Sequence, residues 1–224
     1  MKFSSASWLV CFSLLATTNN ALAEKIAFVG GTLLPISSKP IKDGVLLINN
    51  GKIVDLGQRN AFSIPSDYTI KNIAGQVLMP GIVDTHSHLG IGGDSNEGTP
   101  LNASLRILDS FWPADPRIKT ALSGGITTAN VMPGSGSIIS GQTMYIKLRG
   151  QTVEDMIVEG SIGGMKMANG ENPKGRGSSG AKAPSTRMAT AAMARQQFYD
   201  AMAYKDKKQK ATDKGELSSF AINL

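Results

Sequence analysis

The sequence predicts an α/β protein, and two observations support this fold class. Apolar and β-branched runs separated by turn residues fill the part of the 224-residue chain that follows its first two dozen residues. Farther along, strand-like runs at 124–134 and 143–149 alternate with helical apolar spacing at 103–123 and 185–204. We therefore expect a β-rich segment followed by a mixed part in which strands and helices alternate.

The first 23 residues have the features of a secretory signal. Lys2 lies near the start, an apolar stretch runs from Trp8 to Ala16, and Ala21-Leu22-Ala23 is a small-x-small cleavage pattern. The apolar stretch is too short to cross a bilayer as a helix. We expect export to the periplasm or the medium, with no membrane attachment once the signal is removed.

Composition excludes several kinds of site. The single cysteine, Cys11, lies in the signal, so the mature chain has neither disulfides nor thiolate metal ligands. A lipid anchor on Cys11 is disfavoured because Leu9 and Val10 are not small. The net charge is +6, but no aromatic residues are interleaved with the basic residues of the cluster at 205–210, as they would be in a single-strand nucleic-acid site. We expect no nucleic-acid partner and interpret that cluster as a solvated helix end.

The β-rich segment, residues 24–78, begins with a strand at 26–34. Asn50-Gly51 then separates two apolar runs within 44–57, which is a strong signal for a hairpin with a type I′ turn. We expect this segment to pack and support the chain, without chemistry of its own.

The chain's only two histidines, His86 and His88, follow an apolar run at 77–83 that Pro80-Gly81 interrupts. Residues i and i+2 of a strand point to the same face, so the imidazoles would lie side by side, as in a metal-chelating pair. The alternative is two polar side chains on the solvated face of an edge strand. We favour the metal pair because a buried strand would emerge from its sheet at this point.

The run at 77–90, VLMPGIVDTHSHLG, resembles the first barrel strand of the metal-dependent amidohydrolase superfamily, in which such a His-x-His pair supplies the first two metal ligands. The resemblance implies a (β/α)8 barrel from residue 79 onward, preceded by a small β-sandwich segment at 24–78. A complete barrel takes roughly 250 residues. We therefore expect 79–224 to be the N-terminal part of the barrel, and the chain to be truncated at its C-terminal end.

A glycine-rich loop, a helix and a second strand are expected after the histidines. Asp94 and Glu97 lie in a glycine-rich loop and would either contact a substrate amine or remain solvated. A helix is expected at 103–123, interrupted at Pro113 and Pro116, and the run at 124–134 resembles the family's second strand.

Lys166 is expected on a short apolar strand within 163–174. This run and the run GQTMYIKLRG at 141–150 together resemble exported imidazolonepropionase-like amidohydrolases. Some amidohydrolases use a carboxylated lysine as a metal ligand, and Lys166 is a candidate for that role. The alternative is a lysine whose stem packs while its ammonium reaches water or pairs with Glu171. The helix at 185–204 carries methionines that we interpret as core residues.

The resemblance implies a hydrolase of carbon–nitrogen bonds that acts through a metal-bound hydroxide, with one or two divalent ions, most simply zinc. Its substrates would be small amides, cyclic amides or small peptides. The family's remaining ligands are histidines on later strands and a catalytic aspartate near the end of the barrel, and this chain has no third histidine. The alternative is therefore a non-catalytic remnant, or a module that binds metal or a partner. Association with a complementary C-terminal segment is a further expectation.

Overall fold

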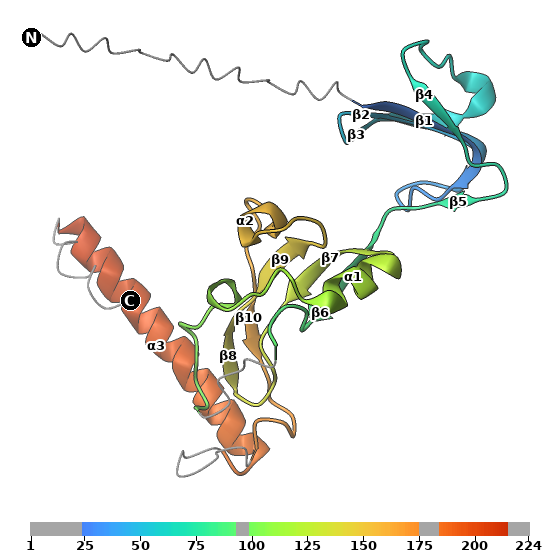
Figure 1. Ribbon diagram of the computed structural model, residues 1–224. Helices are drawn as coiled ribbons and strands as arrows, with labels where there is room; N and C mark the ends of the chain where they lie inside the picture. Colours follow the sequence, from blue (N-terminus) through green and yellow to red (C-terminus); the bar gives the residue numbers. More distant parts are fainter. Residues whose placement is uncertain (1–23, 93–98, 175–183, 215–224) are drawn as a thin grey trace, which may run out of the picture. The chain divides into compact units, whose positions relative to one another are not determined.

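The computed structural model describes residues 24–92, 99–174 and 184–214, so the predicted signal, Asp94 and Glu97 lie outside the described residues (Figure 1). Contacts divide the chain into two compact units, Met1–Pro80 and Gly81–Leu224. Within the described ranges, no helix has the length and apolar content needed to cross a membrane. The combination of sheets and helices confirms the mixed α/β class; among the described residues the strands do not close into a barrel.

The first unit is built on one five-stranded sheet. Its strands are β1 (Lys25–Leu33), β2 (Ile41–Asn49), β3 (Lys52–Gln58), β4 (Thr69–Asn72) and β5 (Val77–Leu78). The order is β3-β2-β1-β4, and β5 pairs with the far end of β1. Strands β2 and β3 run antiparallel to their neighbours, whereas β4 and β5 run parallel to β1. A short 3₁₀ turn, Arg59–Ala61, follows β3.

The hairpin between β2 and β3 is the predicted one. Asn50 and Gly51 both have positive φ, 50° and 71°, as a type I′ turn requires. One face of the sheet is covered by the chain's own loop, since Phe62, Ile64 and Tyr68 pack on it. On the other face, side chains such as Phe28 and Ile48 line an open apolar groove of about 510 Å³.

The second unit contains two small sheets. The first has the order β6-β7-β9, with β6 (Ile82–Ser87) parallel to β7 (Ile126–Val131) and β9 (Met144–Lys147) antiparallel to β7. The second pairs β8 (Ile139–Gln142) with β10 (Met165–Met167) in antiparallel fashion.

One hydrophobic cluster joins the first of these sheets to its connections. Helix α1 (Pro116–Ser123) packs on β7, and helix α2 (Val153–Met156) is fixed by a capping box between Thr152 and Asp155. Alternate residues of β7 and β9 face this cluster, as expected for strands covered on one side. The buried members are Ile91, Ile107, Phe111, Ile118, Ala129, Val131, Met144, Ile146, Leu148 and Met156.

The helix predicted over 103–123 was wrong for most of its length. Only Pro116–Ser123 is α-helical, preceded by a 3₁₀ turn at Ile107–Asp109. Extended pairing takes the place of the helix before Pro116, because Arg106 forms a parallel bridge with Gln142, and Leu101, just before the predicted helix, forms one with Ile139. The spacing of apolar residues within a segment carries no information about a pairing partner nearly forty residues away.

The buried strand expected before the histidines also differs from the structure. Pro80-Gly81 divides it, so that β5 belongs to the first unit and β6 to the second. Ile82 and Val83 are about half exposed, 49% and 53%, because β6 is an edge strand in the described sheet.

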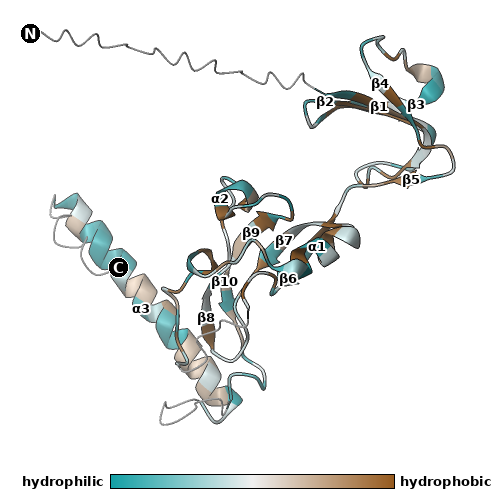
Figure 2. Cartoon of the chain, viewed as in Figure 1, coloured by the Kyte–Doolittle hydropathy of each residue, from teal (hydrophilic) through white to brown (hydrophobic). Residues whose placement is uncertain are grey.

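The last helix, α3 (Arg187–Asp213), extends nine residues beyond its predicted end and is capped by Thr186. The interpretation of its methionines as core residues was wrong for Met188 and Met202, which are 81% and 62% exposed. Figure 2 shows hydrophilic colouring over the C-terminal half of α3, where the basic cluster at 205–210 lies as a solvated helix end.

Candidate functional site

His86 and His88 lie at the end of β6, where the strand pairs with the end of β7. Ser87 between them is 4% exposed and faces the core, whereas both histidines are exposed, as strand alternation requires. The two ring centroids are 5.2 Å apart and the rings are inclined by 77°. The predicted side-by-side arrangement is therefore present in the geometry.

The backbone of Met132 orients His88. The Nδ1 atom of His88 lies 2.8 Å from the carbonyl oxygen of Met132, and the N–H of Met132 donates to the carbonyl of Ser87 at 2.9 Å. A carbonyl oxygen can only accept, so the proton of a neutral His88 resides on Nδ1. This leaves the lone pair of Nε2 free to bind a cation, as in many metal sites.

Lys166, on β10, is brought to the histidines from a distant part of the chain. Its Nζ lies 3.1 Å from Nε2 of His86 and 3.3 Å from Sδ of Met132. Glu171, the alternative partner of Lys166, pairs with Lys174 and Arg187 instead. The alternative interpretation of a Lys166–Glu171 ion pair was therefore wrong. The structure thus places Lys166 beside the histidine pair.

Charge and burial shift the pKa values of His86 and Lys166 in the direction that favours their neutral forms. The positive charge of Lys166 lowers the pKa of His86 below its usual value, partial burial and His88 lower it further, and Asp84 opposes the shift. Burial lowers the pKa of Lys166 as well. A neutral imidazole is the form that binds metals, and a neutral amine is the form that reacts to become carboxylated.

Met132 is the site residue that sequence reasoning missed. It directly follows β7, the strand parallel to β6, and the ends of neighbouring parallel strands converge on one edge of a sheet. Asn130, two residues earlier on the same face of β7, has a buried amide oxygen with no hydrogen-bond partner in the described structure. Within the same ranges, no three His, Cys, Asp or Glu side chains gather closely enough to hold a metal ion.

Comparisons with known proteins find amidohydrolases among the proteins similar to this chain. The structure superposes on the crystal structure of an amidohydrolase from Thermotoga maritima with a TM-score of 0.77 and 38% sequence identity, covering 86% of this chain and 51% of that one. The amidohydrolase tasK of Hapsidospora irregularis is 33% identical over 114 residues, which are 46% of this chain and 12% of the relative.

An imidazolonepropionase from Rhizobium rhizogenes is 27% identical over 131 residues, 48% of this chain and 32% of the relative. No protein-family model matches the chain. The chain thus spans about half of the Thermotoga protein and a third or less of the two curated relatives.

These similarities make the chain a relative of hydrolytic enzymes. More particularly, the chain belongs to the amidohydrolase superfamily and matches the N-terminal part of its members. Metal dependence is general in this family.

Proposed function

We propose that this chain is the N-terminal part of a metal-dependent hydrolase that acts on carbon–nitrogen bonds. The observation that carries the proposal is the convergence of His86, His88 and Lys166 at the strand ends of the second unit. Strands β6 and β7 run parallel, in keeping with the first two strands of a (β/α) barrel that further chain would complete.

The donor set fits a divalent metal. His88 has its Nε2 lone pair available because Nδ1 donates to the carbonyl of Met132, and the lowered pKa of His86 favours its neutral imidazole. Two imidazoles suit zinc, which we propose as the metal, as one or two ions. When bound, the metal would lower the pKa of a water molecule and polarise the substrate carbonyl.

The chain's own residues supply orientation and ligands. Met132 fixes the ring of His88, and Asp84 accepts a hydrogen bond from the backbone N–H of His86 at 3.1 Å. In carboxylated form, Lys166 would add an oxygen ligand beside His86. The carbamate would give a ¹³C resonance in protein equilibrated with ¹³C-bicarbonate, and that resonance would be missing from Lys166→Ala.

The substrates we propose are small molecules with an amide bond, in linear or cyclic amides or small peptides. The supporting facts are the kinship with the amidohydrolase and imidazolonepropionase relatives and the exposed position of both imidazoles. We also propose export to the periplasm or beyond, on the evidence of the signal-like sequence at 1–23.

The test is metal binding by the full 224-residue chain. We expect Zn²⁺, measured by competition with a chromophoric chelator, to bind the unmodified chain and to be lost from His86→Ala/His88→Ala. Gln196→Ala, on the exposed surface of α3, is the control and should bind as the unmodified chain does. Equal zinc affinity in the double variant would refute the site.

A non-catalytic module that binds metal or a partner is the second candidate. It is favoured by the presence of only two histidines in the whole sequence, fewer ligands than hydrolytic zinc sites use. Amide hydrolysis by the chain with zinc, alone or with a complementary C-terminal segment, distinguishes the two. Hydrolysis lost in His86→Ala/His88→Ala establishes the enzyme, whereas metal binding without hydrolysis under either condition establishes the module.

A further inference from the structure

Gly90, two residues after His88, is held through both of its backbone polar groups. Its N–H donates to Oδ2 of Asp115 at 2.8 Å, and its carbonyl accepts from the N–H of Trp112 at 2.7 Å. Asp115 and Trp112 come from the segment that leads into α1, 22 to 25 positions farther along the chain. The exit from β6 is therefore tied to a separate element.

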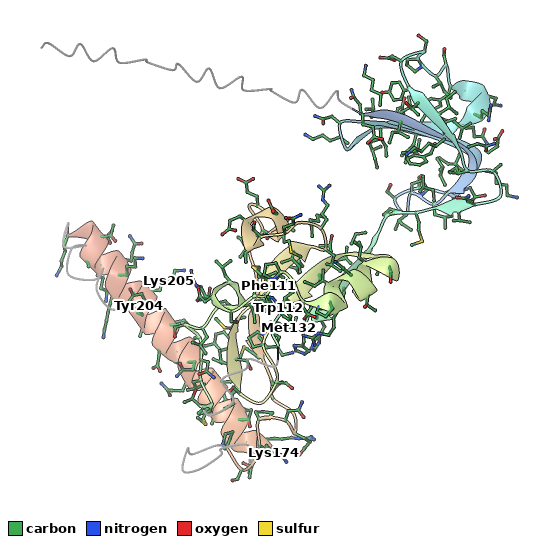
Figure 3. All side chains as sticks on the ribbon, viewed as in Figure 1. Phe111, Trp112, Met132, Lys174, Tyr204 and Lys205 are labelled. Carbon is green, nitrogen blue, oxygen red and sulfur yellow. The ribbon has the colours of Figure 1, made fainter. Side chains whose placement is uncertain are left out.

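The aromatic ring of Phe111 packs closely against Gly90. Gly90 has a φ of +72°, and a Cβ atom at this position would lie 2.3 Å from the Phe111 ring. Phe111 is 7% exposed and belongs to the buried cluster that also receives Leu89 and Ile91. Only glycine combines this backbone conformation with so close an approach of an aromatic ring. Figure 3 labels Phe111 and Trp112, together with Met132, which holds the ring of His88.

The carboxylate of Asp115 does more than cap a helix. It is the N-cap of α1, where Oδ1 accepts from the N–H of Arg117 at 2.9 Å, and a cap of this kind needs only one side-chain oxygen. The second oxygen reaches Gly90, and the Arg117 guanidinium bonds to both oxygens. The side chain is 2% exposed, so both oxygens depend on these partners.

We propose that Phe111, Trp112 and Asp115 form a clamp on Gly90 that fixes the position of His88, and that Asp115 is a positioning residue for the metal site. His88 is held on one side by the hydrogen bond from Met132 to Ser87 and on the other by the clamp. With both sides fixed, the imidazole is presented in a single direction. This inference rests on the proposed function, because it concerns the same histidine pair.

The test compares Asp115→Asn with the unmodified 224-residue chain, using Co²⁺ as the probe. Asparagine keeps one oxygen for the helix cap but turns an NH₂ group toward the N–H of Gly90. We expect about tenfold weaker Co²⁺ binding and an altered ligand-field spectrum, in the range found when groups that orient metal ligands are removed. Unchanged affinity and spectrum in Asp115→Asn would overturn the proposal.

A control variant separates positioning from general destabilisation. Ile118→Val weakens the packing of α1 but leaves Asp115 and Gly90 unchanged. It should keep the Co²⁺ affinity and spectrum of the unmodified chain. A loss in Ile118→Val equal to that in Asp115→Asn would show that stability alone is responsible, and would overturn the clamp.

Amide hydrogen exchange tests the clamp without metal. The Gly90 amide should be protected in the unmodified chain and exchange at least tenfold faster in Asp115→Asn. If that variant does not fold, an unprotected Gly90 amide in the unmodified chain overturns the clamp and a protected one supports it. If the unmodified chain binds neither Co²⁺ nor Zn²⁺, the proposed function fails, while exchange at Gly90 still decides whether the clamp exists.

Discussion

The Nζ of Lys166 lies 3.1 Å from Nε2 of His86, although 80 positions separate them in the chain. Two basic groups at this distance disfavour each other's protonation, and the Lys166 charge is the largest cause of the lowered pKa of His86. Lys166 on β10, which is not part of the β6-β7-β9 sheet, thus affects the ionisation of His86, a candidate metal ligand.

Removing the lysine should therefore raise the pKa of His86. In Lys166→Ala we expect this pKa to move up toward the ordinary value of 6.5, because a positive charge is lost and Asp84 still favours the imidazolium. An NMR titration of the imidazole nitrogens of the metal-free chain measures the shift. Lys147→Ala is the matched control, since the Lys147 ammonium bonds to Thr128 instead. An unchanged His86 pKa in Lys166→Ala would contradict the contact.

Asp115 should make stability depend on pH in the acid range. Hydrogen bonds from Arg117 and the backbone hold its pKa at about 2, against an ordinary value of 3.8. A lowered pKa means that the ionised group stabilises the folded state fully above pH 3.8, and that this contribution is lost as the pH falls through about 2. The contribution is at most about 2 kcal/mol, because Arg117 is half exposed.

Urea unfolding between pH 2 and 6 checks this expectation. The stability difference between the unmodified chain and Asp115→Asn should be greatest above about pH 4 and shrink toward pH 2. Asp109→Asn is the control, because Asp109 forms an exposed pair with Arg106 and should give little difference at any pH. A difference for Asp115→Asn that stays constant over this range would contradict the assignment.

Features determined by a few adjacent residues were predictable from the sequence. The Asn50-Gly51 turn follows from the backbone conformations those residues tolerate, and the common direction of His86 and His88 follows from strand alternation. Neither depends on what another part of the chain does.

Features decided by distant partners were not predictable. The residues before α1 have helical apolar spacing, yet Arg106 among them pairs with Gln142 at the end of β8. Met132 entered the site through its backbone carbonyl, a group that every residue carries and that no sequence pattern marks. The exposure of Met202 likewise depends on which neighbours cover α3, which the helix's own sequence does not state.

The Asn50-Gly51 turn provides a test of backbone conformation without side-chain crowding. Gly51 has a φ of +71°, and a Cβ there would have nothing within 4 Å, so the cost of Gly51→Ala is conformational. We expect a loss of about 1–2 kcal/mol in the free energy of unfolding. Gly170→Ala is the matched control, because Gly170 is equally uncrowded without a positive φ and should cost almost nothing. Equal effects at the two glycines would contradict the turn assignment.

Met156 and Met202 test the two burial states of one residue type on helices of the second unit. Met156, at the end of α2, is 1% exposed within the buried cluster, whereas Met202 on α3 is 62% exposed. Met156→Ala should cost about 2–5 kcal/mol through lost packing and the cavity left behind. Met202→Ala should stay within about 0.5 kcal/mol, since alanine is also a better helix former. Urea unfolding measures both, and a large loss at Met202 would mean that this face of α3 is covered in solution and that the methionine is a core residue after all.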